Sequence, residues 1–474
     1  MIDLKSLTIK KAHDSLVKKE FSAVELLNAY RENIEKRNAK LNAYLEVFDD
    51  ALGQAKKIDE KIARGETISE LAGIPIAVKD NILYKDHHAS AASKILSGYM
   101  AVYDSTVTQK LKKEHAIFVG RTNMDEFGHG VGENSAFGQT LNPLDESRNP
   151  GGSSSGSAAA VVSDMALVGI GTDTGGSLRL PAHCTGLVGL KPTYGAVSRY
   201  GIIAMGSSFD QVGPIGKTVG DAEIIFNAIK GLDAKDSTTR EYEKVSMKTG
   251  KQKMRIGIPR AFVDKGVDAD VVERFAEAEQ KLKALGHEIV DIDLPNIGNA
   301  LAVYYILIPA EISTNLARFD GMRFGLHKDG TNGIDEYLKS RGAGFGPEAR
   351  RRIMVGTYVL SHGYYDAYYN KATAVREVIK QEFKKVFKDV DAFITPTGVS
   401  PALKIGANAG DPLAEYLLDI FTCTANVAQV CAISIPMGTV KREDKDLPVG
   451  LQITAPHFAE DTLFTLGKQF LSEV

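Results

Sequence analysis

Glycine is concentrated in one part of this chain, and that concentration constrains the fold more than any other feature of the sequence. Of the 45 glycines among 474 residues, 19 lie between Gly120 and Gly216. In that segment, short apolar runs (AIFVG, MALVGI, LVGL and GIIAM) alternate with loops of Gly, Ser, Thr and Pro. This pattern is typical of a largely buried sheet whose loops carry function.

Outside that segment, the hydrophobic pattern predicts helices and strands in alternation. Ser22 and Glu25 form a capping box ahead of a run whose apolar residues recur at helical spacing. LAGIPIAV predicts a strand that ends at Lys79. MRIGIP, DADVVERFAEAEQKLKALG and HEIVDIDLP predict a strand, a helix closed by Gly286 and a returning strand, which together form a βαβ unit.

The C-terminal part continues this pattern. We predict a helix from Glu348 to about Lys388, a strand at VDAFITPT and another helix at DPLAEYLLDIFTCTANVA. No internal repeat or Pro-rich linker divides the chain. The sequence therefore predicts one α/β domain over residues 1–474, with a mixed central sheet flanked by helices on both faces. Its core would span about residues 73–216, with a helical segment of about residues 1–70 packed on it.

Composition excludes several classes of function. With 57 Lys and Arg against 60 Asp and Glu, the net charge of −3 provides no basic field for a nucleic-acid backbone. No uncharged apolar run approaches the roughly 18–20 residues of a membrane span, and the charged N-terminal sequence lacks a signal core. We expect a cytoplasmic protein, or one of an organellar matrix, without membrane contact. The three cysteines indicate buried thiols, with neither a disulfide framework nor a metal site.

Two short segments concentrate the residues that could do chemistry. Asn149–Ser157 (NPGGSSSGS) runs directly into AAAVV, so it is a loop that leads into a helix. Gly171–Ser177 (GTDTGGS) follows the strand predicted at MALVGI. Hydroxyls and bare backbone N–H groups in such loops suit an anion or an oxyanion. A flexible linker is the alternative for the first segment, but its short length and apolar neighbours favour function.

Three classes of enzyme compete for these two segments. A dinucleotide site requires G-x-G-x-x-G, but Gly169, Gly171 and Gly175 are spaced one residue too widely and the expected acidic residue does not follow. A nucleophile elbow at Ser154 would follow a strand, whereas the polar LDESRNPG precedes it. The third class is a serine amidohydrolase with a lysine base. Burial can lower the pKa of a lysine such as Lys79 until it activates a serine.

Taken together, the motifs resemble those of the amidase signature family. LAGIPIAVKDNI, GGSSSGSAAA and GTDTGGSLRLPA occur in the family's order and spacing, and the resemblance covers essentially the whole chain. It implies an acyl nucleophile at Ser177, a bridging serine in a cis peptide at Ser153, and a base at Lys79. The backbone N–H groups that would form the oxyanion hole belong to Thr174, Gly175, Gly176 and Ser177.

Further segments narrow the resemblance to one branch of the family. NMDEFG, NLARFDGMRFG, RRIMVGTYVLSHGYYDAYYNKA and LLDIFT are similar to the glutaminase subunits of glutamyl-tRNA(Gln) amidotransferases. This implies a glutaminase in a heterotrimer, passing ammonia to the B and C subunits, which convert Glu-tRNA(Gln) to Gln-tRNA(Gln). We expect no cofactor or metal on this chain, because a partner would use ATP and Mg²⁺ and the B partner would make most of the tRNA contacts. The alternative is a free-standing amidase acting on a small amide.

The resemblance also implies how glutamine would be held. The matching positions put Arg352 at the α-carboxylate, Asp419 at the α-ammonium group and Tyr304 nearby. Arg351 and Tyr305, each one position away, are alternatives for two of these. Opposite charges at the two ends of the amino acid suit such a pairing.

The sequence departs from the usual family pattern in several places. His129 stands where NMDEF-x-M-G has methionine, and it is a further candidate contact in the substrate pocket. Ser155 replaces a glycine in GGSSSGS, and Gln429-Val430-Cys431 replaces Gly-Leu-Pro. These departures concern the pocket or the route of ammonia and leave the Ser–Ser–Lys chemistry in place.

Overall fold

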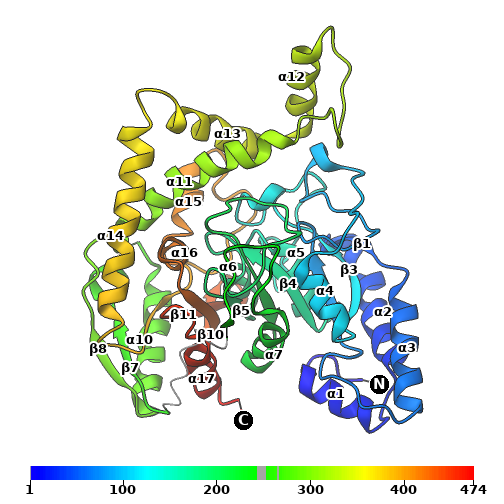
Figure 1. Cartoon of the computed structure of the whole chain (residues 1–474). Helices are drawn as coiled ribbons and strands as arrows, with labels where there is room; N and C mark the ends of the chain where they lie inside the picture. The colour runs from blue at the N-terminus through cyan, green and yellow to red at the C-terminus, as the bar shows by residue number, and fades with distance from the viewer. Residues whose placement is uncertain (1, 243–251, 264–265, 474) are drawn as a thin grey trace.

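The computed structural model describes residues 2–242, 252–263 and 266–473. These residues form one sheet of eleven strands. The strands are β1 (Tyr44–Val47), β2 (Pro75–Lys79), β3 (Ile117–Thr122), β4 (Val168–Asp173), β5 (Val188–Lys191), β6 (Gln211–Gly216), β7 (Arg255–Ile258), β8 (Glu288–Asp291), β9 (Ala392–Pro396), β10 (Cys431–Arg442) and β11 (Lys445–Ala455). Their order across the sheet is β1-β3-β2-β4-β6-β5-β10-β11-β9-β7-β8 (Figure 1).

Parallel and antiparallel pairs occur in the same sheet. Strand β2 is parallel to β3 and β4, and β7 is parallel to β8 and β9. The other neighbouring pairs are antiparallel. The predicted mixed sheet is therefore confirmed. The apolar run GIIAM is not one of these strands: Ile202 forms an isolated bridge with Ile82, and β6 lies beside β4.

Helices pack on both faces of this sheet. They are α1 (Ile9–Val17), α2 (Ala23–Leu41), α3 (Ala51–Ala63), α4 (Thr106–Lys113), α5 (Ser155–Val162), α6 (Arg179–Thr185), α7 (Val219–Ile229), α9 (Arg260–Val263), α10 (Ala269–Ala284), α11 (Ala300–Asn315), α12 (Gly333–Gly344), α13 (Pro347–Leu360), α14 (Lys371–Val386), α15 (Pro412–Leu417), α16 (Cys423–Ala428) and α17 (Glu460–Leu471). On β6, Ile215 packs with α5 and α6, whereas Val212 packs in the cluster that includes α7 and α17. Successive strand residues point to opposite faces, so these two residues serve opposite layers.

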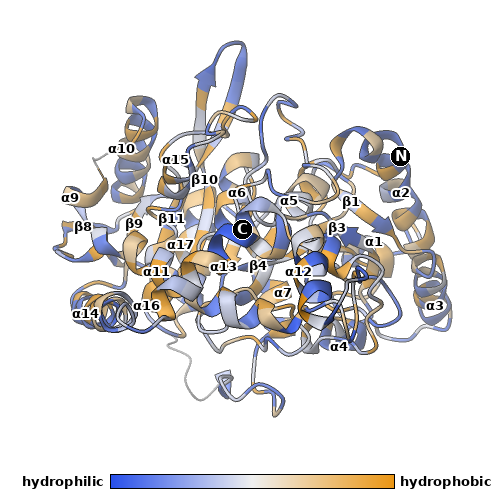
Figure 2. Cartoon of the chain, turned by 90° about the horizontal axis from the view of Figure 1, so that it is seen from above, coloured by the Kyte–Doolittle hydropathy of each residue, from blue (hydrophilic) through white to orange (hydrophobic). Residues whose placement is uncertain are grey.

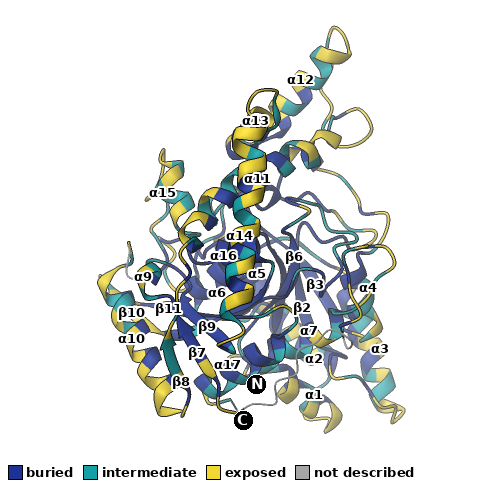
Figure 3. Cartoon of the chain, turned by 60° about the vertical axis from the view of Figure 1, so that its left-hand side comes forward, coloured by how far each residue is buried: buried dark blue, intermediate teal, exposed yellow. Residues whose placement is uncertain are grey.

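The strands carry the core, and the exposed residues lie on the outer helices. Figure 3 shows the central strands as buried, while much of α12 and α14 is exposed. The far end of the β10–β11 hairpin projects as a hydrophilic tip (Figure 2), where Glu443 and Lys445 are exposed. Helix α12 rises away from the body of the fold in Figure 1. The buried sheet therefore carries the loops at the ends of its strands.

The N-terminal helices lie at one end of the sheet. Ser22 accepts a hydrogen bond from the backbone N–H of Glu25, whose side chain in turn accepts one from the Ser22 N–H, so the predicted capping box at the start of α2 is confirmed. Leu27 on α2 and Ile58 on α3 share a core cluster with Val119 on β3. The βαβ unit predicted from MRIGIP onward is also confirmed as β7, α10 and the parallel β8.

Two long helices predicted from the sequence are each broken in the structure. The first ends at Leu360 and resumes as α14 at Lys371, after a π-helical turn. Gly363 adopts φ +88° in the break, a left-handed conformation that glycine tolerates and a helix does not. The second is divided into α15 and α16. Thr422, the N-cap residue of α16, follows the break, and its carbonyl accepts a hydrogen bond from Arg179 at 2.7 Å.

One helical stretch, Ile297–Arg318, is long and apolar enough by length and composition to cross a membrane, a feature that the sequence analysis did not single out. It contains α11, and half of its most apolar window is buried inside the fold. Ile308 and Ile312 are fully buried in a core cluster. The apolar composition of this stretch is therefore the composition of a core helix packed against its neighbours.

Candidate active site

Lys79, the last residue of β2, is fully buried. Its Nζ lies 2.8 Å from Ser153 Oγ, 2.9 Å from Ser154 Oγ and 3.0 Å from Thr172 Oγ1. Burial lowers the pKa of Lys79 to about 7, against the opposing charges of three aspartates. A buried amine that loses its proton near neutral pH can accept one from a hydroxyl beside it.

Ser153 lies in the loop that leads into α5. The Gly152–Ser153 peptide is cis, as the resemblance implies. Ser154 also contacts Lys79 and donates to the Thr172 carbonyl at 3.2 Å, a contact that sequence reasoning missed. Ser155, where the family has glycine, is the first residue of α5, so its backbone is helical and accommodates a side chain.

Asp125 is a second residue that the sequence analysis did not single out. Its Oδ1 accepts the backbone N–H of Asn134 at 2.7 Å, and its Oδ2 accepts that of Gly132 at 2.9 Å. Its own N–H donates to the Ser153 carbonyl at 3.2 Å. Burial raises the pKa of Asp125 to about 6, although these hydrogen bonds and Lys79 oppose the shift. Asp125 therefore connects the loop after NMDEF to the loop that holds Ser153. The acidic residue within NMDEF is the sequence feature from which this role could have been predicted.

The segment Thr174–Ser177 follows β4 and turns sharply. A Cβ on Gly175 would lie 2.6 Å from the Tyr304 hydroxyl and ring, and one on Gly176 would collide with Thr422. None of the four backbone N–H groups donates to a residue that the structure describes. These donors are therefore available to an oxyanion, the arrangement that acyl transfer requires.

Ser177 lies at the edge of this site, with 9% of its surface exposed. Within the described residues its hydroxyl makes no hydrogen bond, whereas the Ser153 hydroxyl contacts Lys79. The structure thus brings Lys79 and Ser153 together directly and leaves the hydroxyl of Ser177 without a protein partner among these residues.

Arg352 lies in the interior, on α13. It is 4% exposed, whereas the side chain of Arg351 is 43% exposed. Arg352 Nε donates to Glu348 Oε1 at 2.7 Å, and the guanidinium lies 5.3 and 5.5 Å from the ring centres of Tyr305 and Tyr416. Of the two candidate arginines, the structure places Arg352 where a buried anion could be bound.

The two candidate tyrosines serve different neighbours. Tyr304 is buried with its hydroxyl against Gly175. Tyr305 donates to Asp419 Oδ2 at 3.0 Å. Burial raises the pKa of Asp419 to about 7, with Tyr305 and Arg352 opposing the shift. Asp419 and Arg352 therefore share Tyr305 as a neighbour, an arrangement that suits ligands for the two charged ends of an amino acid.

His129 is fully buried beside this group. Neither ring nitrogen has a hydrogen-bond partner among the described residues. Burial lowers the pKa of His129 well below its ordinary value, and the charge of Arg352 adds to the shift. Burial therefore favours the neutral imidazole, and both of its nitrogens lack a partner among the described residues.

Two cavities open next to the Arg352 end of the site. One of about 260 Å³ is bordered by Asn134, Glu348 and Glu415, among others. The second, of about 460 Å³, shares Asn134 and Glu348 with it. Lys79, Ser153 and Ser177 line neither cavity, so these openings lie beside the chemistry and not at it.

Comparison with known proteins shows the family to which this chain belongs. The Amidase family model matches residues 25–464, and the chain belongs to the amidase family. It is therefore an enzyme of that class. It is 46% identical over 475 residues to the glutamyl-tRNA(Gln) amidotransferase A subunit of Desulfatibacillum aliphaticivorans, covering 98% of this chain and 97% of the relative. The protein of the same name from Clostridium botulinum (strain Langeland) is 48% identical over 480 residues, covering 100% and 98%.

Solved structures share the fold. The crystal structure of the glutamyl-tRNA(Gln) amidotransferase A subunit from Thermotoga maritima superposes with a TM-score of 0.82 at 38% identity, covering 100% of this chain and 96% of that one. The peptide amidase of Stenotrophomonas maltophilia has the same TM-score at 27% identity, covering 99% and 97%. The fold of this chain is thus similar along its whole length both to an amidotransferase A subunit and to a peptide amidase.

Proposed function

We propose that this chain is the glutaminase subunit of a glutamyl-tRNA(Gln) amidotransferase, hydrolysing glutamine and supplying ammonia to its partners. Relatives named as the A subunit of that enzyme cover nearly the whole chain at 46–48% identity, which favours this role over a free-standing amidase. The observation that carries the chemistry is the buried Lys79 with its Nζ 2.8 Å from Ser153 Oγ.

In the proposed reaction, neutral Lys79 takes the proton of Ser153 while Ser153 takes that of Ser177. The Ser177 oxygen then attacks the side-chain amide carbon of glutamine. The relay returns a proton to the departing nitrogen, so that ammonia leaves and a γ-glutamyl ester remains on Ser177. Water repeats the sequence on the ester, releasing glutamate and the free serine.

The developing negative charge is stabilised at the turn after β4. Its donors would be the backbone N–H groups of Thr174, Gly175, Gly176 and Ser177, which have no other partner among the described residues. Each donor of this kind is typically worth about 3 kcal/mol in the transition state. Arg352 would bind the α-carboxylate and Asp419 the α-ammonium group, with Tyr304 between this end and the turn.

The partners take the remaining steps. The B and C subunits would complete a heterotrimer, with ATP and Mg²⁺ used by a partner and Glu-tRNA(Gln) held mainly by the B partner. The net charge of −3 supports this division, because this chain offers no overall basic field for tRNA.

The test is ammonia release from glutamine by this chain alone and with the B and C subunits and charged tRNA. We expect release that depends on the partners and that Ser177→Ala abolishes without unfolding the protein. Activity on many small amides by the chain alone, indifferent to the partners, would instead identify a free-standing amidase. Undiminished release by Ser177→Ala would refute the nucleophile.

A further inference from the structure

His129 is the one residue in the described part of the chain with two buried side-chain polar atoms that lack a partner. The residue is fully buried, so water does not satisfy them at the surface. A neutral imidazole has one N–H donor and one lone-pair acceptor, and leaving both unpaired in the interior costs free energy. Buried polar groups are normally hydrogen-bonded, and at a binding site a ligand can supply the missing partners.

The backbone holds His129 firmly in place. Its N–H donates to the Glu126 carbonyl at 2.9 Å, and its own carbonyl accepts the Asn134 side-chain amide at 3.2 Å. Asn134 is in turn bound by Asp125 through its backbone N–H. The unpaired imidazole is therefore part of an ordered loop.

Two contacts place His129 and Tyr304 next to the serine relay. A Cβ on Gly128 would lie 3.5 Å from Ser153 Oγ, and His129 follows directly in the chain. Tyr304 packs against Gly175, in the turn that ends at Ser177. The charge of Arg352 acts to lower the pKa of both side chains. A substrate held at the relay and at Arg352 would therefore lie close to His129 and Tyr304.

The neutral imidazole and the nearby guanidinium of Arg352 together indicate which chemical group of a substrate His129 could bind. Only Nε of Arg352 donates to a described residue, namely Glu348, so its two terminal nitrogens are available for an anion. A neutral imidazole beside them adds an N–H donor without adding charge. Carboxylates accept several such hydrogen bonds at once.

We propose that His129 binds the substrate, donating its N–H to the α-carboxylate of glutamine beside the guanidinium of Arg352. This inference rests on the proposed function for the identity of the substrate. Methionine, the usual family residue at this position, has no N–H to offer, so the contact is a specificity feature of this chain.

The test replaces His129 by that methionine in the complex with the B and C subunits. Loss of a hydrogen bond to a charged group is expected to raise KM for L-glutamine about tenfold and change kcat little. The same change on a Ser177→Ala background should weaken L-glutamine binding by a similar factor in calorimetry. Binding of 4-aminobutanamide, which is glutamine without its carboxylate, should not weaken. His129→Gln, which restores an N–H donor, should recover part of the loss.

His362→Met, at an exposed histidine, is the matched control and should leave the constants unchanged. Unchanged glutamine binding in His129→Met would overturn the inference, and so would an equal loss for 4-aminobutanamide, since that indicates a structural role. Wild-type complex that releases no ammonia from glutamine would instead count against the proposed function, which separates the two failures.

Discussion

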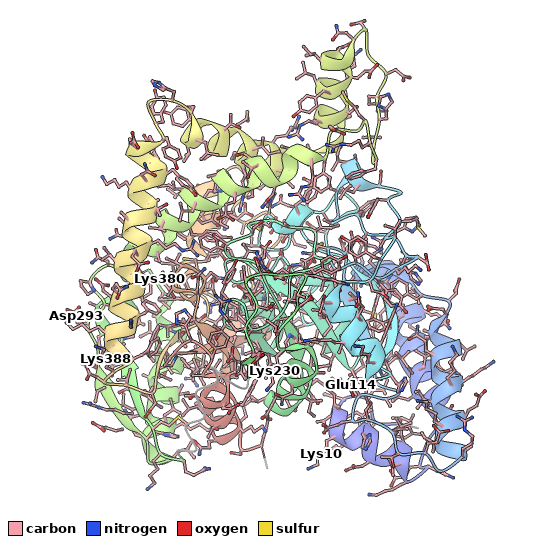
Figure 4. All side chains as sticks on the ribbon, viewed as in Figure 1. Lys10, Glu114, Lys230, Asp293, Lys380 and Lys388 are labelled. Carbon is pink, nitrogen blue, oxygen red and sulfur yellow. The ribbon has the colours of Figure 1, made fainter. Side chains whose placement is uncertain are left out.

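Two buried lysines end strands of the same sheet, and only one of them is equipped for catalysis. Lys79 ends β2 and Lys191 ends β5, and both are at most 1% exposed. Other lysines, such as Lys10 and Lys388, lie at the periphery of the molecule (Figure 4). Burial lowers the pKa of Lys79 to about 7 and that of Lys191 to about 8.

Their hydrogen-bond partners distinguish them. Lys79 contacts the hydroxyls of Ser153, Ser154 and Thr172, which can exchange protons with it. Lys191 donates to the Pro192 carbonyl at 2.8 Å, and a carbonyl has no proton to give. A lowered lysine pKa is therefore insufficient to identify a base, and the neighbouring hydroxyls are what favour Lys79 over Lys191 as the proposed base.

The largest predicted effect separates the two lysines by substitution. Lys79→Met should lower kcat for ammonia release by about 10³-fold or more, because it removes the base of the relay. Lys191→Met should retain kcat in the folded protein. Steady-state ammonia assays on the complex, with circular dichroism of each variant, measure both. Equal losses of kcat in the two variants would show that Lys79 and Lys191 do not differ in their importance for catalysis.

The pH dependence of turnover gives the next effect. Because Lys79 has a pKa of about 7 and acts without its proton, kcat/KM should fall about tenfold for each pH unit below 7 and level off above it. Lys191→Met should show the same midpoint. A midpoint that moved in Lys191→Met would assign the titration to the wrong lysine.

The smallest effect is on stability and belongs to Lys191. Its folded pKa of about 8 lies below the ordinary lysine value of 10.5, so the unfolded chain binds more protons between these values and stability rises with pH there. Relative to Lys191→Met, the wild type should gain about 3 kcal/mol in the free energy of unfolding from pH 8 to 10.5. Urea unfolding at a series of pH values measures the difference. A flat difference would show that Lys191 is not buried as a neutral amine.

The sequence alone predicted the local features of the site. Lys79 at a strand end, the Gly/Ser loop before a helix and the turn after β4 are all readable within a few residues. The sequence could not separate IPIAVK from LVGLK, since both are apolar runs ending in lysine. The serines that distinguish them lie 74 and 75 positions from Lys79.

Long-range contacts account for what the sequence did not predict. Asp125 acts through backbone N–H groups and a carbonyl that only the fold brings to it. The choice between Arg351 and Arg352 depends on which side of α13 faces the interior. A shift of one position along the helix moves a side chain from the interior to the surface. The break at Gly363 follows from a left-handed turn that helical periodicity does not reveal.

In the proposed mechanism Lys79 activates Ser177 through Ser153, and trapping the acyl-enzyme tests this relay most directly. The wild-type complex would be mixed with glutamine, quenched in acid within one turnover, and digested for mass spectrometry. We predict a γ-glutamyl ester on the peptide containing Ser177, and none in Lys79→Met or Ser153→Ala. An ester on Ser153 or Ser154, or one that forms on Ser177 at the wild-type rate in Lys79→Met, would contradict the account.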